Sequence, residues 1–63
     1  MMDRTEILGL IEGLSHSQGF YGRLLESFRD MEQEDPEAFE ACMAELEAQN
    51  FSEPLDAIRY FEE

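Results

Sequence analysis

The chain has 63 residues and a formal net charge of −12 at neutral pH, because 16 Asp and Glu residues face only four Arg and no Lys. About 60% of the unfolded surface is buried at this length, which predicts one small domain over residues 1–63 without room for a substrate cleft. A hydrophobic content of 43%, with five Phe and two Tyr, is too high for a disordered acidic tail and predicts a packed core.

Helical signals begin near the N-terminus. Asp3 and Glu6 have the spacing of a capping box, and Met2 and Ile7 stand where a hydrophobic staple would close. The following residues form one apolar stripe: Ile7, Leu8, Leu10, Ile11 and Leu14. The sequence therefore predicts a first helix that starts after Asp3.

Glycines interrupt the first two helical segments, and each costs about 1 kcal/mol relative to Ala inside a helix. Gly9 and Gly13 lie opposite the apolar stripe, and Gly19 and Gly22 are placed similarly in the next segment. One interpretation is a smooth strip that another helix or subunit approaches closely. The other is that Gly13 ends the first helix and that residues 15–22 form a looser turn.

The second predicted helix is the longest. Ser15 and Gln18 repeat the capping-box spacing. Its apolar positions are Phe20, Tyr21, Leu24, Leu25, Phe28 and Met31. This wide stripe predicts that the second helix is the hub of the core.

Asp35 and Pro36 predict a boundary, because the residue before proline leaves the α region while Asp can cap and Pro can begin the next helix. Phe39, Cys42, Met43 and Leu46 then share one face. Asn50 suits the left-handed position after this helix and would place Phe51 over Leu46.

The segment 52–54 restarts the chain as a short fourth helix with Leu55, Ile58 and Phe61 expected to face inward. No stretch shows the period-two alternation of a strand. The fold class is therefore predicted to be all-α, a compact bundle of three to four short helices.

The negative charge is concentrated in one region. Thirteen of the sixteen acidic residues lie from Glu26 onward, and no base occurs between Asp30 and Glu47. Such a one-sided field can serve solubility, repel nucleic acid or attract a basic partner. The candidate partner-binding residues are Asp30, Glu32, Glu34, Asp35, Glu37, Glu40, Glu45, Glu47, Glu53 and Asp56. The sequence predicts an acidic recognition end and a nearly neutral end that carries the glycines.

Other chemistry lacks support in the sequence. His16 and Glu12 supply too few ligands for zinc, and the acidic run from Asp30 lacks the Gly and the bidentate Glu of a calcium loop. Neither a catalytic triad nor a phosphate-binding glycine loop is evident. We therefore expect no enzyme activity, no metal and no cofactor. Cys42 is predicted to be a buried apolar side chain that resists thiol reagents.

A single cysteine fits a reducing compartment, and no segment approaches the ~20 apolar residues that span a bilayer. We expect a cytoplasmic protein with no membrane contact. Phe20 and Tyr21 could stack on bases, but the charge opposes direct nucleic-acid binding. Core packing is the expectation for both rings, with the Tyr21 hydroxyl reaching water or a turn carbonyl. Arg23 and Arg29 could pair with nearby carboxylates such as Glu26 or Asp30.

Two segments, SQGFYGRLL at 17–25 and LEAQNF at 46–51, resemble short helical proteins of unassigned function carried by gut bacteria and their mobile elements. This resemblance implies a small cytoplasmic accessory protein and transfers no site residues. In size and charge alone, the chain is also similar to anti-CRISPR proteins and other phage inhibitors.

Two functions remain open. The acidic region could occupy the basic groove of a nucleic-acid-binding protein and inhibit or modulate that protein by mimicking nucleic acid. Alternatively, the chain could be a scaffold module that forms a homodimer or docks a partner helix through its glycines, with acidity serving solubility.

Overall fold

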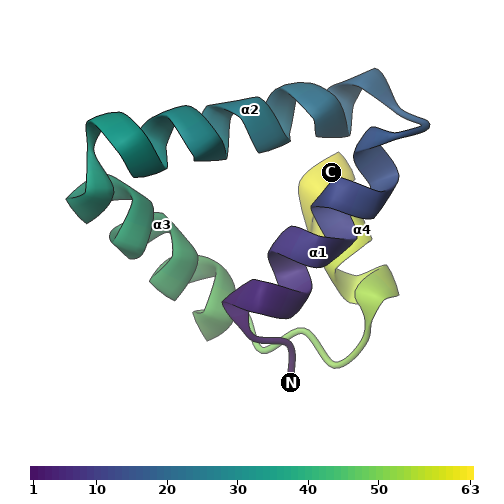
Figure 1. The fold of residues 1–63 in the computed structure, drawn as a ribbon. Coiled ribbons are helices and arrows are strands. Elements are labelled where there is room, and N and C mark those ends of the chain that lie inside the picture. Colours follow the sequence, from purple (N-terminus) through teal and green to yellow (C-terminus); the bar gives the residue numbers. More distant parts are fainter.

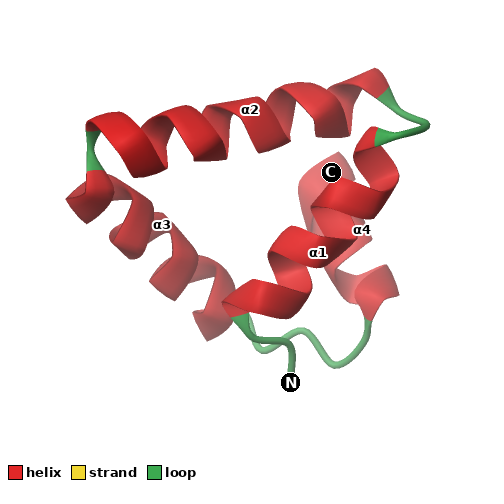
Figure 2. Cartoon of the chain, in the orientation of Figure 1, coloured by secondary structure: helices red, strands yellow, loops and turns green.

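Four helices follow one another with short connections in the computed structural model, which describes all residues from 1 to 63. They are α1 (Arg4–Ser15), α2 (Gly19–Glu34), α3 (Pro36–Ala48) and α4 (Pro54–Glu62). In Figure 1, α2 runs along the top, α3 descends from its end, and the N-terminal α1 crosses in front of α4. Figure 2 shows that no strand interrupts this arrangement. The predicted all-α bundle is confirmed.

The helix boundaries set by capping residues agree with the sequence. The Asp3 carboxylate accepts from the Glu6 N–H at 2.9 Å, and the Glu6 side chain accepts from the Asp3 N–H at 3.3 Å, which completes the capping box. Asp35 ends α2 and caps α3 by accepting from the Ala38 N–H at 3.2 Å. Asn50 has the expected left-handed backbone with φ of 56°.

The junction between α1 and α2 differs from the prediction. Helix α1 continues through Gly13 to Ser15, so Gly13 does not end it. The Ser15 hydroxyl donates back to the Glu12 carbonyl oxygen at 2.6 Å, and Gln18 is the residue that precedes α2. A serine hydroxyl within a helix can donate to the carbonyl oxygen of a preceding turn. At Ser15 this bond forms instead of the predicted cap at the start of α2.

The core is a single cluster built from all four helices, from the segment before α1 and from the loop between α3 and α4. Its buried members are Met2, Ile7, Ile11, Tyr21, Phe28, Phe39, Met43, Leu46, Phe51 and Ala57. The backbone of α1 approaches each of the other three helices, whereas α2 approaches only α1 and α3. Tyr21 of α2 also reaches α4 through Phe61 and Glu62, so α1 and α2 each contact the other three helices, and α1 shares the central position that the sequence predicted for α2. A central α1 contacts its neighbours on both flanks of its stripe.

Two apolar residues predicted to face inward lie on the surface instead. Leu55 is 47% exposed, while Ala57 on the same helix is fully buried. A small side chain at this contact lets α4 approach the core closely. Phe20 is 44% exposed, although the neighbouring Tyr21 is fully buried as predicted. The stripe of α2 is therefore narrower at its start than its sequence suggests.

The ends of the chain are tied to the rest of the fold. The Met2 N–H donates to the Phe51 carbonyl oxygen at 3.0 Å, and both side chains belong to the core. At the other end, the Tyr21 hydroxyl donates to Glu62 Oε2 at 2.6 Å. These links join the segment before α1 to the loop before α4, and the last turn of α4 to the start of α2.

Candidate protein-binding surface

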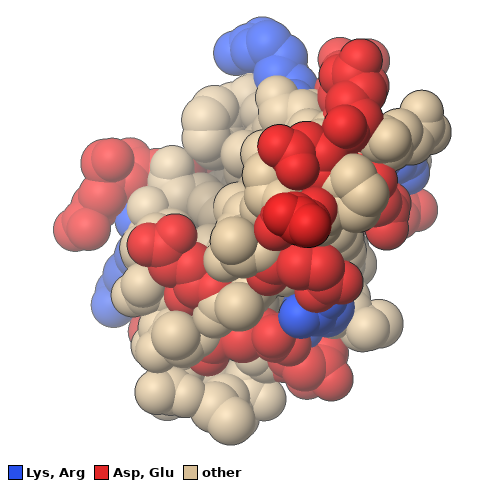
Figure 3. Space-filling view, turned by 90° about the vertical axis from the view of Figure 1, so that its left-hand side faces the viewer, with Lys and Arg blue, Asp and Glu red and all other residues tan.

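The ten candidate carboxylates follow the second half of α2, the turn at Asp35, the length of α3 and the start of α4. We call this set the acidic surface. Eight of the ten residues are exposed, and Glu47 and Asp56 are half-buried. Figure 3 shows the side of the molecule that lies at the left of Figure 1, where carboxylates spread over much of the face with few basic groups among them. The fold thus leaves most of the acidic surface open to solvent.

Arg4 binds two members of the acidic surface from α1. Its backbone N–H donates to Glu47 Oε2 at 2.9 Å, and its guanidinium donates to Glu47 Oε1 at 3.4 Å and to Glu40. Hydrogen bonds to Glu40 and then Glu47 raise the pKa of the Arg4 guanidinium above its usual value. This contact leaves no signal in the sequence, because the partners are separated by 36 and 43 residues.

Two further members of the acidic surface accept hydrogen bonds from nearby backbone N–H groups. Asp35 caps α3, and the half-buried Asp56 accepts from the Ser52 N–H at 3.2 Å. The remaining six are exposed and form no ion pair or side-chain hydrogen bond: Asp30, Glu32, Glu34, Glu37, Glu45 and Glu53. These six are the carboxylates that an external basic group can reach without breaking a contact within the fold.

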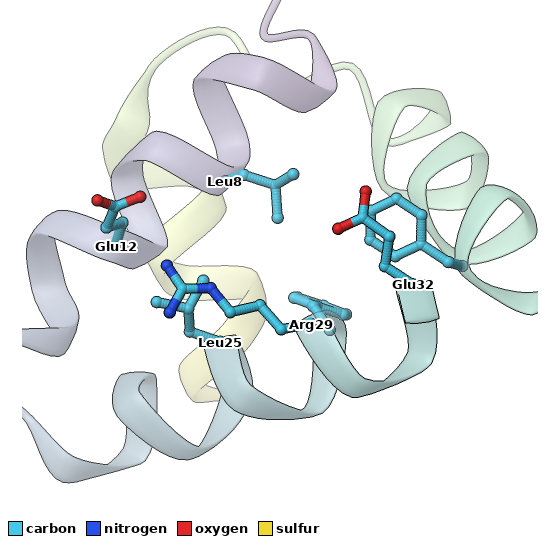
Figure 4. A pocket seen from close by; sticks show the side chains of 7 residues that line it. Leu8, Glu12, Leu25, Arg29 and Glu32 are labelled. Atoms are coloured by element: carbon cyan, nitrogen blue, oxygen red, sulfur yellow. The ribbon is translucent and has the colours of Figure 1, made fainter. Parts of the chain in front are cut away.

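The expected ion pairs of Arg23 and Arg29 with Glu26 or Asp30 do not form, since all ion pairs within 4.0 Å belong to Arg4. Arg29 instead lines a cavity of about 130 Å³ between α1, α2 and α3. Figure 4 shows its guanidinium directed toward the Glu12 side of this cavity, away from Glu32. Leu8, Leu25, Phe28 and Phe39 supply the apolar lining. The cavity therefore brings one positive and two negative groups to the edge of the core.

Tyr21 places its polar atom differently from the sequence expectation. Its hydroxyl donates to Glu62 rather than to water or to a turn carbonyl. Burial, followed by this hydrogen bond, raises the pKa of the Tyr21 phenol to about 12. The contact also brings Glu62 beside the start of α2, which the sequence predicted to be nearly neutral. The predicted division into an acidic end and a neutral end is therefore incomplete.

Cys42 is half-buried next to the core, on the face of α3 that the periodicity indicated. Burial, and secondarily the charge of Glu45, raise the pKa of its thiol. A raised pKa lowers the thiolate fraction and with it the reactivity. The side chain thus serves mainly as a small apolar group.

Neither a metal centre nor a membrane span is found. No three His, Cys, Asp or Glu side chains are grouped so that they could hold a metal ion, and His16 is exposed after the end of α1. None of the four helices has the length and apolar character needed to cross a bilayer.

Comparison of the chain with protein-family models, with curated proteins and with solved structures found no match. The resemblance to short helical proteins of gut bacteria therefore stays a prediction.

Proposed function

We propose that this protein is an acidic binding module that occupies the basic, nucleic-acid-binding groove of another protein and thereby inhibits or modulates it. The observation that carries the proposal is the set of six exposed carboxylates that have no partner within the fold. Charges left unpaired in this number oppose folding through mutual repulsion. A basic partner would convert that repulsion into attraction and would also increase the rate of association.

The spacing of the charges supports mimicry of a nucleic-acid strand. Eight carboxylates occur among the 18 residues from Asp30 to Glu47. Five of them have no partner within the fold: Asp30, Glu32, Glu34, Glu37 and Glu45. At about 1.5 Å of rise per residue, these five give about one free carboxylate per 5 Å of helix axis, which is comparable with the ~3.4 Å between phosphates along one strand of duplex DNA. The row of carboxylates changes direction at Asp35, between α2 and α3. The protein therefore resembles nucleic acid in its charge density along the chain and not in the shape of a straight duplex.

The test is binding to a fluorescent arginine-rich peptide at 50 and 200 mM salt. Affinity should fall about tenfold over this range for every two counterions released, by analogy with phosphate contacts. Replacing Glu37 and Glu45 with Gln should weaken binding. The matched control replaces Glu12 and Glu26 with Gln, because these residues lie outside the acidic surface and form no ion pair. Equal weakening by both variants, or affinity independent of salt, would contradict the proposal.

A second candidate function is self-association through α1. Gly9 and Gly13 are exposed inside the helix, and a Cβ atom built on either glycine meets nothing within 4 Å. Packing within the chain therefore does not require glycine at either position. Close approach of a partner surface to the α1 backbone would explain why glycine occurs there. Sedimentation should then detect a dimer that Gly9→Leu dissociates. A monomer at every protein concentration would exclude this candidate.

A further inference from the structure

A groove with a different composition lies between the start of α2 and the end of α4. Its volume is about 440 Å³, and it is lined by Gln18, Phe20, Phe61, Glu62 and Glu63. None of these residues belongs to the acidic surface. We call it the aromatic groove, because two phenylalanine rings and two carboxylates meet there although they come from distant parts of the sequence.

The two rings are held in place by the core. Phe20 and Phe61 both contact the fully buried Tyr21 in edge-to-face geometry, with ring centroids at 5.1 Å and 6.4 Å. Phe20 nevertheless remains 44% exposed, and Phe61 is half-buried. A ring that is already fixed loses little conformational freedom when a ligand covers it, so this exposed aromatic surface is suited to binding.

The carboxylates of the groove are available to a positive group. The Tyr21 hydroxyl occupies Glu62 Oε2 at 2.6 Å, which holds this side chain in place and leaves Oε1 for another donor. Glu63 also lines the groove, and neither carboxylate has an ion pair within 4.0 Å. Arg23, one turn after Phe20, lies over Gly19 and does not line the groove. The groove therefore offers negative charge beside aromatic faces without a basic partner of its own.

We propose that the aromatic groove binds an arginine side chain of the partner protein. The guanidinium would lie over the exposed ring of Phe20 and donate to Glu62 Oε1 and Glu63. Arginine suits this environment better than lysine because its planar group stacks on rings and pairs with carboxylates through two N–H groups. A nucleic-acid base would meet the rings, but its phosphates would be repelled by the two carboxylates.

This inference rests on the proposed function for the basic character of the partner, but it assigns contacts to a different part of the molecule. A partner that reaches both the acidic surface and the aromatic groove would bind through two linked sites. Linked sites increase affinity well beyond either site alone when both can be reached together. The groove would then fix the orientation of a partner that is attracted by charge.

The experiment is an NMR titration of the whole chain with the peptide acetyl-Gly-Arg-Gly-amide at low salt. A second peptide carries citrulline, which has nearly the shape of arginine without its charge. Saturable shifts are expected at Gln18, Phe20, Phe61 and Glu62 with the arginine peptide, and much smaller ones with citrulline. Equal shifts with both peptides would overturn the proposal, as would the absence of shifts at these residues.

Two substitutions test whether the aromatic character of Phe20, rather than its volume alone, contributes to binding. Phe20→Ala and Phe20→Leu should each weaken arginine binding about two- to fivefold, since the contribution expected from a cation over an exposed ring corresponds to this factor. Leu55→Ala is the matched control, because Leu55 is 47% exposed on α4 and does not line the groove. Unchanged affinity in Phe20→Leu would overturn the role of the ring. Shifts confined to α3 and the end of α2 would refute arginine binding in the aromatic groove. They would remain consistent with the proposed function, because those helices carry the acidic surface.

Discussion

Replacing Gly9 with Ala tests whether the outer face of α1 is free. Gly9 lies in the middle of α1 with a backbone that Ala also adopts, since no glycine has a positive φ. An added Cβ meets no atom within 4 Å. The substitution therefore neither removes a contact nor creates a clash, and its effect should come from helix propensity and from the lower entropy of the unfolded chain.

The expected gain in unfolding free energy for Gly9→Ala is about 0.5 to 1 kcal/mol. In a domain of this size, each kcal/mol shifts the melting temperature by about 4 to 8 °C. Gly13→Ala should give a smaller gain, because Gly13 lies only two residues before the end of α1, where helices fray.

Urea denaturation followed by far-ultraviolet circular dichroism measures these differences. The matched reverse variant is Ala41→Gly, at an exposed site in the middle of α3, and should lose about as much stability as Gly9→Ala gains. The contrary result is a Gly9→Ala variant that is neutral or destabilised while Ala41→Gly behaves as expected. In that case, the outer face of α1 is covered in solution, and the loss should depend on protein concentration.

Phe28→Ala should cost about 3 to 5 kcal/mol and unfold much of the population, whereas Phe20→Ala should cost clearly less, because Phe20 is 44% exposed and its main contact is the edge-to-face pair with Tyr21. Because the pKa of the Tyr21 phenol is raised from 10.0 to about 12, the stability that its neutral form contributes is complete below pH 10 and is lost as pH rises through 12. Tyr21→Phe should lose about 1 kcal/mol at neutral pH with its hydrogen bond to Glu62, and should flatten this alkaline dependence in pH-dependent denaturation. The Cys42 thiol should react slowly with a thiol reagent in the folded protein and rapidly in urea, and fast reaction without urea would contradict its burial.

Local signals predicted much of the fold. The caps at Asp3 and Asp35 act on backbone groups within three residues, so the same residues that identify them in sequence also form the bonds. The left-handed backbone of Asn50 could also be predicted, because few residues other than Gly and Asn adopt a positive φ at the end of a helix. The cap predicted at Ser15 is wrong. The Ser15 hydroxyl can either cap the start of α2 or donate to the preceding Glu12 carbonyl oxygen, and local sequence does not indicate which bond forms.

Features that depend on distant contacts could not be predicted. Periodicity places Leu55 and Ala57 on α4, but which of them faces the core depends on how α4 rotates against α1. The bond between Arg4 and Glu47 and the bond between Tyr21 and Glu62 likewise join residues more than 40 positions apart. The acidic surface could be located from sequence because exposure is the ordinary state of carboxylates. Its contact with Arg4 required the fold.

The attachment of α4 has a consequence for motion within the folded state. Helix α4 has nine residues, which is too short to be stable alone, and it is held by contact with α1, by Ala57 and by the Tyr21 bond to Glu62. Its amide hydrogens should therefore exchange through a local opening that costs less free energy than global unfolding. This opening separates Phe61 and Glu62 from Phe20, so any ligand of the aromatic groove must slow exchange throughout α4.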